Sequence, residues 1–165
     1  MKRVALYPGS FDPFTVGHLD IVQRLSPLYD EVVVAVLSNP KKTPYLPEEA
    51  RVRSIEESVK GLPNVRVLCS AGATVDVARQ AGARTMIRGL RSVTDFEYET
   101  TLAAGYYYMA PEIETLFLLA KPEHGYISSS LVREIHALGG DVSALVPAPV
   151  LSALAQKNPR KENEK

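Results

Sequence analysis

The residues best suited to chemistry lie near the start of the chain, in a segment rich in proline and glycine. Residues 7–18 read Tyr-Pro-Gly-Ser-Phe-Asp-Pro-Phe-Thr-Val-Gly-His, between a short apolar run and a run with apolar residues at helical spacing. Backbone N–H groups at the start of a helix favour anions, and Ser10 and His18 add side-chain donors there. The pattern predicts a phosphate-binding turn. The alternative is a plain connecting turn in which His18 has no ligand.

Two arginines form a second candidate for binding phosphate. Arg88 and Arg91 follow an apolar run and stand three positions apart across a glycine. A guanidinium group can hold two phosphate oxygens at once, so this pair predicts a grip on separate phosphates. The alternative is structural: either arginine is a solvated charge or the partner of Asp95, Glu97 or Glu99.

A lysine and a run of serines complete the candidates. Lys42 lies in a loop flanked by prolines, where a mobile cation could close over a charged substrate, while Lys41 beside it is taken as an ordinary exposed lysine. Ser128 to Ser130 precede a helical pattern, so their hydroxyl and N–H groups suit phosphates. A simple helix cap is the alternative for the serines, and the two roles are compatible.

These residues need elements to position them, and the chain alternates apolar runs with helical patterns. We expect strands at 4–7, 32–37, 65–69, 85–87 and 113–120, and helices at about 18–28, 47–60, 74–81, 94–109, 128–138 and 149–157. Gly82 is expected to end the third helix, and Thr94 to Glu97 fit a capping box for the fourth. The order predicts an α/β fold with a doubly wound, five-stranded parallel sheet, similar to Rossmann nucleotide-binding folds.

That sheet would bring the candidates together. Ligands of such sheets bind beyond the carboxyl ends of the strands. The candidate side chains follow the strands in turn: Ser10, Lys42, Thr74, Arg88 with Arg91, and Ser128 to Ser130. We therefore expect one shared rim.

Composition limits the alternatives. The 165 residues suit one domain, 1–157, followed by a polar tail, 158–165, expected to be disordered. Lys plus Arg and Asp plus Glu are 19 each, without the basic excess of a general nucleic-acid binder. No run is long and apolar enough to span a membrane, so a cytoplasmic protein is expected. Cys69, the single cysteine, is expected to be a buried strand thiol. A Walker motif and an H-E-x-x-H zinc motif are absent.

Three segments resemble one enzyme family. They are the P-G-S-F-D-P-x-T-x-G-H of residues 8–18, the I-R-G-L-R-S-V-T-D-F-E-Y-E of residues 87–99 and the Y-I-S-S-S of residues 126–130. All three are similar to bacterial phosphopantetheine adenylyltransferases, nucleotidyltransferases with an (H/T)-x-G-H motif, and the likeness covers essentially residues 3–157. The resemblance implies transfer of the adenylyl group of ATP to 4′-phosphopantetheine, giving dephospho-coenzyme A and pyrophosphate in coenzyme A biosynthesis. It also implies Mg²⁺ carried by the ATP phosphates rather than by protein ligands, a homohexamer, and dephospho-coenzyme A or coenzyme A as product or feedback ligand.

The resemblance also implies a role for each matching residue. His18 would be the principal group stabilising the transition state, with Lys42 and Ser10. The acceptor would be bound by Ser10, Lys42, Thr74 and Arg88. ATP would be bound by Ser10, Phe11, His18, Gly89, Leu90, Arg91, Glu99, His124, Gly125, Tyr126, Ile127, Ser128, Ser129 and Ser130.

Some positions depart from the family pattern. Val16 replaces the usual asparagine of T-N-G-H, and Gly105-Tyr106 stands where methionine and asparagine are common on the helix lining the pantetheine site. Adenylyl transfer is therefore more firmly indicated than the acceptor. Two alternatives stay open: a sister nucleotidyltransferase acting on nicotinamide mononucleotide or glycerol phosphate, and a nucleotide-binding regulatory module without turnover. Tyr106 to Tyr108 suit the core, a subunit interface or a substrate wall, and His136 suits a partly buried structural histidine.

Overall fold

A computed structural model describes residues 2–38 and 42–157. Its elements are β1 (Val4–Gly9), α1 (Val16–Leu25), η1 (Ser26–Leu28), β2 (Glu31–Leu37), α2 (Glu48–Val59), β3 (Val65–Ser70), α3 (Thr74–Ala81), β4 (Thr85–Leu90), α4 (Val93–Met109), β5 (Glu114–Leu119), η2 (Pro122–His124), α5 (Ser129–Ala137) and α6 (Ala148–Gln156), where η marks a short 3₁₀ helix. The expected tail, 158–165, lies outside the described residues. Within them, every helix is too short or too polar to cross a membrane.

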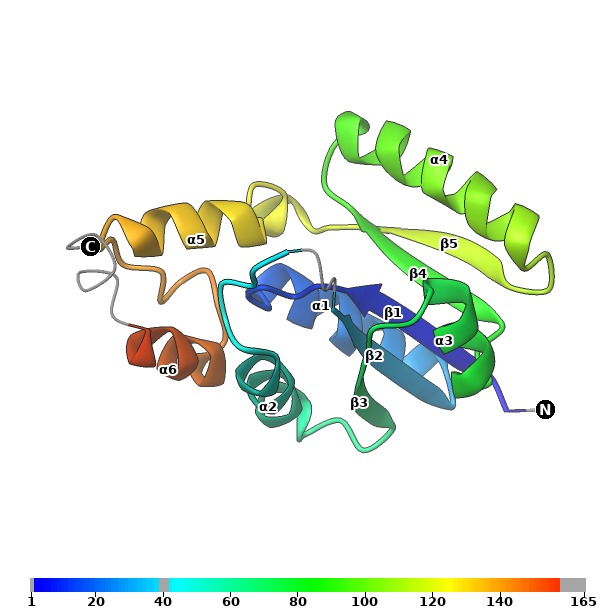
Figure 1. Cartoon of the computed structure of the whole chain (residues 1–165), viewed down its shortest axis with the longest axis horizontal. Helices are drawn as coiled ribbons and strands as arrows, with labels where there is room; N and C mark the ends of the chain where they lie inside the picture. The colour runs from blue at the N-terminus through cyan, green and yellow to red at the C-terminus, as the bar shows by residue number, and fades with distance from the viewer. Residues whose placement is uncertain (1, 39–41, 158–165) are drawn as a thin grey trace.

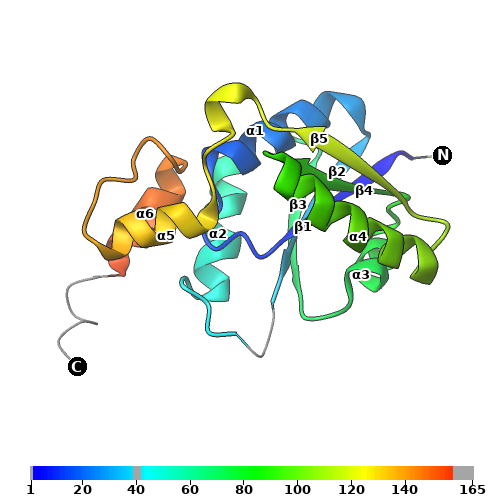
Figure 2. The same ribbon diagram turned by 90° about the horizontal axis from the view of Figure 1, so that it is seen from above.

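The five strands form one parallel sheet in the order β3-β2-β1-β4-β5, which confirms the predicted doubly wound fold. The order reverses at β1, which pairs with β2 on one side and β4 on the other. In Figure 1, α3 and α4 lie on one face of the sheet and α1 on the other. α6 packs beside α2, and both α5 and α6 lie away from α4 (Figure 2). A ligand site is expected at the reversal, beyond the carboxyl end of β1.

Two hydrophobic cores share the central strands. Along β1, Ala5 and Tyr7 join the core under α1, α2, α5 and α6, whereas Val4 and Leu6 join the core under α3. β2 alternates in the same way. Successive side chains of a strand point to opposite faces, so a strand covered on both faces must be apolar throughout. This is why the apolar runs at 4–7 and 32–37 were recognisable as strands.

The outer strands behave differently from the central ones, and one prediction fails there. Cys69 lies on β3 as expected, but it is exposed rather than buried. β3 is an edge strand with a partner on one side only, so its surface is covered less completely. Partial desolvation of the sulfur atom by neighbouring side chains still raises the pKa of the Cys69 thiol, and the Glu48 carboxylate adds to the effect.

Helix ends agree with the predictions within a few residues, with one correction. Gly82 ends α3 in the left-handed conformation, at φ +70°, as predicted. The capping box assigned to Thr94–Glu97 is wrong, because α4 begins at Val93 and its cap is Ser92. The Ser92 hydroxyl accepts a hydrogen bond from the backbone N–H of Asp95 at 3.1 Å. Ser92 has the extended backbone that a cap requires, whereas Thr94 is already helical.

One face of α4 stays uncovered. α4 has no buried residue, and Tyr107 and Tyr108 are 63% and 90% exposed. Large apolar side chains are exposed along α4 and β5: Val93, Phe96, Tyr98, Tyr107, Tyr108, Met109, Leu116 and Leu119. We call this set the α4–β5 face. A core position for Tyr107 and Tyr108 is thus wrong, while Tyr106 packs partly against the core under α3.

Candidate active site

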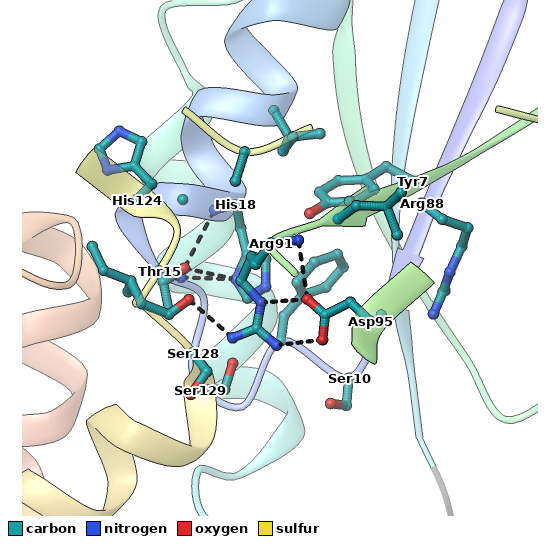
Figure 3. A pocket seen from close by; sticks show the side chains of 18 of the residues that line it. Tyr7, Ser10, Thr15, His18, Arg88, Arg91, Asp95, His124, Ser128 and Ser129 are labelled. Carbon is teal, nitrogen blue, oxygen red and sulfur yellow. Dashed lines mark hydrogen bonds and ion pairs between the residues drawn. The ribbon is translucent and has the colours of Figure 1, made fainter. Parts of the chain in front are cut away.

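A pocket of about 370 Å³ opens where the strand order reverses, beyond the carboxyl ends of β1 and β4 (Figure 3). Its walls come from the β1–α1 loop, the first turn of α1, β4, α4 and the start of α5. The lining is Tyr7, Pro8, Gly9, Ser10, Phe11, Thr15, Gly17, His18, Ile21, Arg88, Gly89, Leu90, Arg91, Asp95, Glu99, Ala120, His124, Ile127, Ser128, Ser129, Ser130 and Arg133. Three of the sequence motifs therefore meet in one place, as the fold requires.

The cap of α1 fixes the tautomer of the His18 ring. Thr15 caps α1, and its hydroxyl accepts a hydrogen bond from the His18 N–H at 3.3 Å. In return the Thr15 backbone N–H donates to Nδ1 of His18 at 3.0 Å. Because Nδ1 accepts this bond, it carries no proton, and the proton of the neutral ring sits on Nε2. The capping arrangement thus makes His18 a donor through Nε2.

The surroundings of His18 favour the neutral ring. The rings of Phe11 and Phe14 lie 5.1 Å and 5.5 Å from it, centroid to centroid. Burial lowers the pKa of His18 to about 3, and the positive charge of Arg91 contributes in the same direction. At neutral pH the side chain is therefore an uncharged hydrogen-bond donor that a change of a few pH units does not alter.

Arg88 is paired with a carboxylate and still faces the pocket. Its Nε and one terminal nitrogen donate to the two carboxylate oxygens of Glu99 at 2.6 Å and 2.8 Å. The other terminal nitrogen donates to the Pro8 carbonyl at 3.2 Å. Burial alone would lower the pKa of Arg88, but Glu99 outweighs it and the pKa lies above its ordinary value. Three of the five guanidinium N–H groups have these partners, which leaves two for a ligand among the contacts described.

Arg91 also lines the pocket while paired with a carboxylate, that of Asp95. Its side chain donates to both carboxylate oxygens of Asp95, at 3.1 Å and 3.3 Å, and to the Ile127 carbonyl at 3.2 Å (Figure 3). Asp95 also accepts the Arg91 backbone N–H at 3.0 Å. The alternative that both arginines pair with acidic residues is therefore confirmed. It does not replace the phosphate role, because both side chains also line the pocket.

The serine run opens α5 as predicted, and each hydroxyl has a different partner. Ser128 is the cap, accepting the Leu131 N–H at 3.0 Å. Ser129 donates to the Pro13 carbonyl at 2.8 Å. Ser130 accepts from Arg133 at 3.1 Å. The helix start is thereby fixed against the β1–α1 loop, with its N–H groups beside the pocket.

Four predicted site residues lie outside the pocket lining described above: Lys42, Thr74, Gly125 and Tyr126. Lys42 is exposed in the loop before α2, and Thr74 is the partly exposed first residue of α3. Gly125 and Tyr126 follow η2, and Tyr126 is 65% exposed. The other predicted site residues all line the pocket. The strand ends thus bring most of the predicted site residues together around one pocket, but these four residues lie outside its lining.

The sequence prediction missed several pocket residues, notably Tyr7, Thr15, Asp95 and Arg133. Thr15 carried a usable signal, since a threonine three residues before a helix-start histidine fits a cap. Arg133 stands one helical turn after Ser130. Tyr7 carried no such signal, because an aromatic residue in a buried strand suits the core. Burial raises the pKa of its hydroxyl, so Tyr7 is a neutral donor.

The positions that depart from the family pattern have simple surroundings. Val16 donates its backbone N–H to the Leu145 carbonyl at 3.0 Å, a bond that needs no particular side chain. Its side chain packs against the core under α1. A Cβ added at Gly105 would meet no atom within 4 Å. Neither position lines the pocket.

Comparison with known proteins places this geometry among nucleotidyltransferases. Residues 6–135 match the family model described as cytidylyltransferase-like. A phosphopantetheine adenylyltransferase of Lacticaseibacillus casei is 50% identical over 157 residues, which cover 94% of both chains. One from Synechococcus sp. is 50% identical over 156 residues, covering 94% of this chain and 98% of the relative. A solved Vibrio parahaemolyticus protein, provisionally assigned as a nicotinate-nucleotide adenylyltransferase, superposes with a TM-score of 0.73 over 98% of this chain and 97% of its own. At 18% identity, it supports the fold alone.

Proposed function

Since the chain belongs to the phosphopantetheine adenylyltransferases, within the cytidylyltransferase-like family, we propose that it transfers the adenylyl group of ATP to 4′-phosphopantetheine. The products are dephospho-coenzyme A and pyrophosphate, and the reaction belongs to coenzyme A biosynthesis. The support is twofold: relatives that are half identical over almost the whole chain, and a pocket at the strand-order reversal with donors suited to phosphate.

The reaction asks little covalent chemistry of the protein. An oxygen of the acceptor phosphate attacks the α-phosphorus of ATP, and a new P–O bond forms. The bond from that phosphorus to the bridging oxygen of the β-phosphate breaks, and its electron pair leaves with pyrophosphate. The acceptor phosphate is already ionised at neutral pH, so no general base is needed. The protein contributes positioning and stabilisation of the developing charge.

The observation that carries the mechanism is the fixed tautomer of His18. A donor aimed into the pocket, held by the Thr15 cap and neutral at physiological pH, suits the α-phosphate oxygens as charge builds on them. In this assignment Ser10 and Lys42 hold the incoming phosphate, and Arg88 binds the acceptor. ATP is bound by Phe11, Gly89, Leu90, Arg91, Glu99 and residues 124–130. Thr74 lines the pantetheine arm.

We propose that Mg²⁺ is held by the ATP phosphates rather than by the pocket carboxylates. Asp95 and Glu99 line the pocket, and both are paired with arginines. Among residues 2–38 and 42–157, no group of three or more His, Cys, Asp or Glu side chains could hold a metal ion. Mg²⁺ would neutralise polyphosphate charge and favour pyrophosphate as leaving group. Arg88 and Arg91 would supply the fixed positive charge.

The uncovered α4–β5 face supports a proposal about assembly. An exposed apolar area of this kind on a protein marks an interaction site. We propose that copies of the chain associate through it, in line with the homohexamer that the family resemblance implies. Cytoplasmic location and binding of coenzyme A or dephospho-coenzyme A as product or feedback ligand are part of the same proposal.

One assay tests the activity. The purified chain is incubated with ATP and Mg²⁺ and with 4′-phosphopantetheine, nicotinamide mononucleotide or glycerol phosphate, and pyrophosphate release is followed. Release only with 4′-phosphopantetheine is expected. Release only with another acceptor would make the chain a sister nucleotidyltransferase. ATP binding without release under any condition would indicate a regulatory module.

A further inference from the structure

Asp12 is a buried carboxylate that no step of the proposed reaction uses. It lies in the β1–α1 loop between Ser10 and Thr15 and is 9% exposed. Its two carboxylate oxygens accept hydrogen bonds from the backbone N–H groups of Tyr45, at 2.6 Å, and Leu46, at 2.8 Å. A carboxylate bound by two successive N–H groups is held strongly, and losing it would leave two donors without acceptors. Asp12 therefore joins two loops that are more than thirty residues apart in sequence.

A second buried side chain joins the same two loops. Arg51 of α2 is 4% exposed. It donates to the Leu46 carbonyl at 3.2 Å and to the Ser10 carbonyl at 2.7 Å. Both backbone polar groups of Leu46 are thus bound by charged side chains, and the Leu46 side chain is itself buried. This point of the loop before α2 is fixed in position.

The β1–α1 loop is also held from its other side. Arg133 of α5 donates to the Asp12 carbonyl at 2.6 Å, and Ser129 donates to the Pro13 carbonyl at 2.8 Å. The loop is therefore a rigid reference against α5, and the contact of Asp12 with residues 45 and 46 places the second loop relative to it. Lys42 stands three residues before Tyr45, within about 10 Å of chain length.

We propose that Asp12 is a positioning residue that sets Lys42 against Ser10, so that both act on the incoming phosphate together. The inference rests on the proposed function, because it assumes that Lys42 serves the acceptor. Asp12 touches no reacting atom. Its effect on the rate comes through the backbone of residues 45 and 46. A displacement of about 1 Å of a substrate-positioning group can cost about 10²-fold in rate.

The tether itself is tested without activity. Asp12→Asn keeps the size of the side chain but replaces one acceptor by an NH₂ group facing an N–H donor. Amide hydrogen exchange at Tyr45 and Leu46 is expected to accelerate at least about tenfold. The matched control is Asp20→Asn: within residues 2–38 and 42–157, Asp20 is the other buried carboxylate, 6% exposed, and it binds Arg24 and Lys121 instead. In that variant the two amides are expected to keep their protection. Unchanged exchange in Asp12→Asn would overturn the proposal.

The functional link is tested by a double-mutant cycle with Lys42→Ala, measuring kcat/KM for 4′-phosphopantetheine at saturating ATP. We expect Asp12→Asn to lower it about 10- to 100-fold alone and less than about threefold when Lys42 is already alanine. If the fold-losses in kcat/KM of the two single variants multiply in the double variant, Asp12 acts independently of Lys42 and the proposal is overturned. If Lys42→Ala alone has no effect, the role of Lys42 in the proposed function fails first. The exchange result then still reports on the tether. Thermal melting of each variant separates these effects from loss of folding.

Discussion

The inner and outer parts of the candidate site are built in different ways. His18, Arg88 and Arg91 line the pocket, and each is fixed by hydrogen bonds to the chain before any substrate arrives. Lys42 and Thr74 lie outside the pocket lining: Lys42 is exposed in the loop before α2, and Thr74 is the first residue of α3. Donors that already point where charge develops need no reorganisation during reaction. Under the proposed function, we assign charge stabilisation to the inner part, where Arg88 also binds the acceptor, and further recognition of the acceptor to the outer part.

The largest effect is expected where the inner part meets the reacting phosphate. His18→Ala removes a preorganised donor and should lower kcat by roughly 10²- to 10³-fold. ATP affinity should change little, because the arginines and the start of α5 remain. Steady-state kinetics and ATP titration of the same preparation measure the two quantities. Unchanged turnover would remove the central assignment and with it the contrast between the two parts.

A pair of substitutions compares the stability of the two parts. Glu99→Ala leaves the half-buried Arg88 without its carboxylate and should cost about 2 to 3 kcal/mol of unfolding free energy. Lys42→Ala removes an exposed charge and should change stability by less than about 0.5 kcal/mol. Urea denaturation gives both values. Equal costs would mean that the outer loop is as firmly built as the inner part.

Lowering the pH should reduce the stability of the folded protein through His18, a residue of the inner part. Its pKa is about 3 in the folded protein, against an ordinary value of 6.5, because burial opposes the charged ring. Between these two pKa values, the His18 ring binds a proton in the unfolded chain but not in the folded protein. Its contribution to the free energy of unfolding is therefore complete above about pH 6.5 and is lost as the pH falls toward 3. Between pH 6.5 and pH 5 the loss is about 1.6 kcal/mol. His18→Gln should flatten the stability profile over this interval, and a profile as steep as that of the wild type would contradict the assignment.

The smallest effect concerns the cap that orients the histidine. Thr15→Ala removes the hydroxyl that accepts the His18 N–H and should cost about 1 kcal/mol. The bond from the Thr15 backbone N–H to Nδ1 does not depend on that hydroxyl, so the tautomer and most of the turnover should survive. Thr101→Ala, on the exposed surface of α4, is the control and should fall within about 0.5 kcal/mol of the wild type. A turnover loss as large as that of His18→Ala would mean that the hydroxyl, and not the backbone, fixes the ring.

Sequence patterns were sufficient for features that depend on local periodicity. The Val-rich run of β2 is apolar on both faces because helices cover both, and Gly82 adopts the conformation that suits glycine. Sequence patterns were insufficient where the burial of a side chain or the start of a helix depends on the surrounding structure. Cys69 is exposed because β3 is an edge strand, and strand order cannot be read from one strand. Ser92 and Thr94 were both possible caps, and only the backbone conformation decides between them.

The site shows the same limit. The motifs predicted that His18, Arg88 and Arg91 would meet, because strand ends converge in a parallel sheet. Which acid each arginine would take depended on distances across β4 and α4 that spacing does not fix. The contact of Asp12 with Tyr45 and Leu46 joins residues 33 and 34 positions apart, and no local pattern announces it.

The middle strand of the sheet is the first one to leave the ribosome. β1 is complete when residue 9 is made, but its partner β4 begins at Thr85, so one edge of β1 stays open until half of the chain has been synthesised. Pairing over such a separation is slow, and an apolar strand with an open edge is prone to association with other chains. Because the same segment continues into the β1–α1 loop of the candidate site, substitutions in residues 4–18 should alter folding yield in the cell as well as catalysis. Activity measured in extracts therefore needs to be divided by the amount of soluble protein.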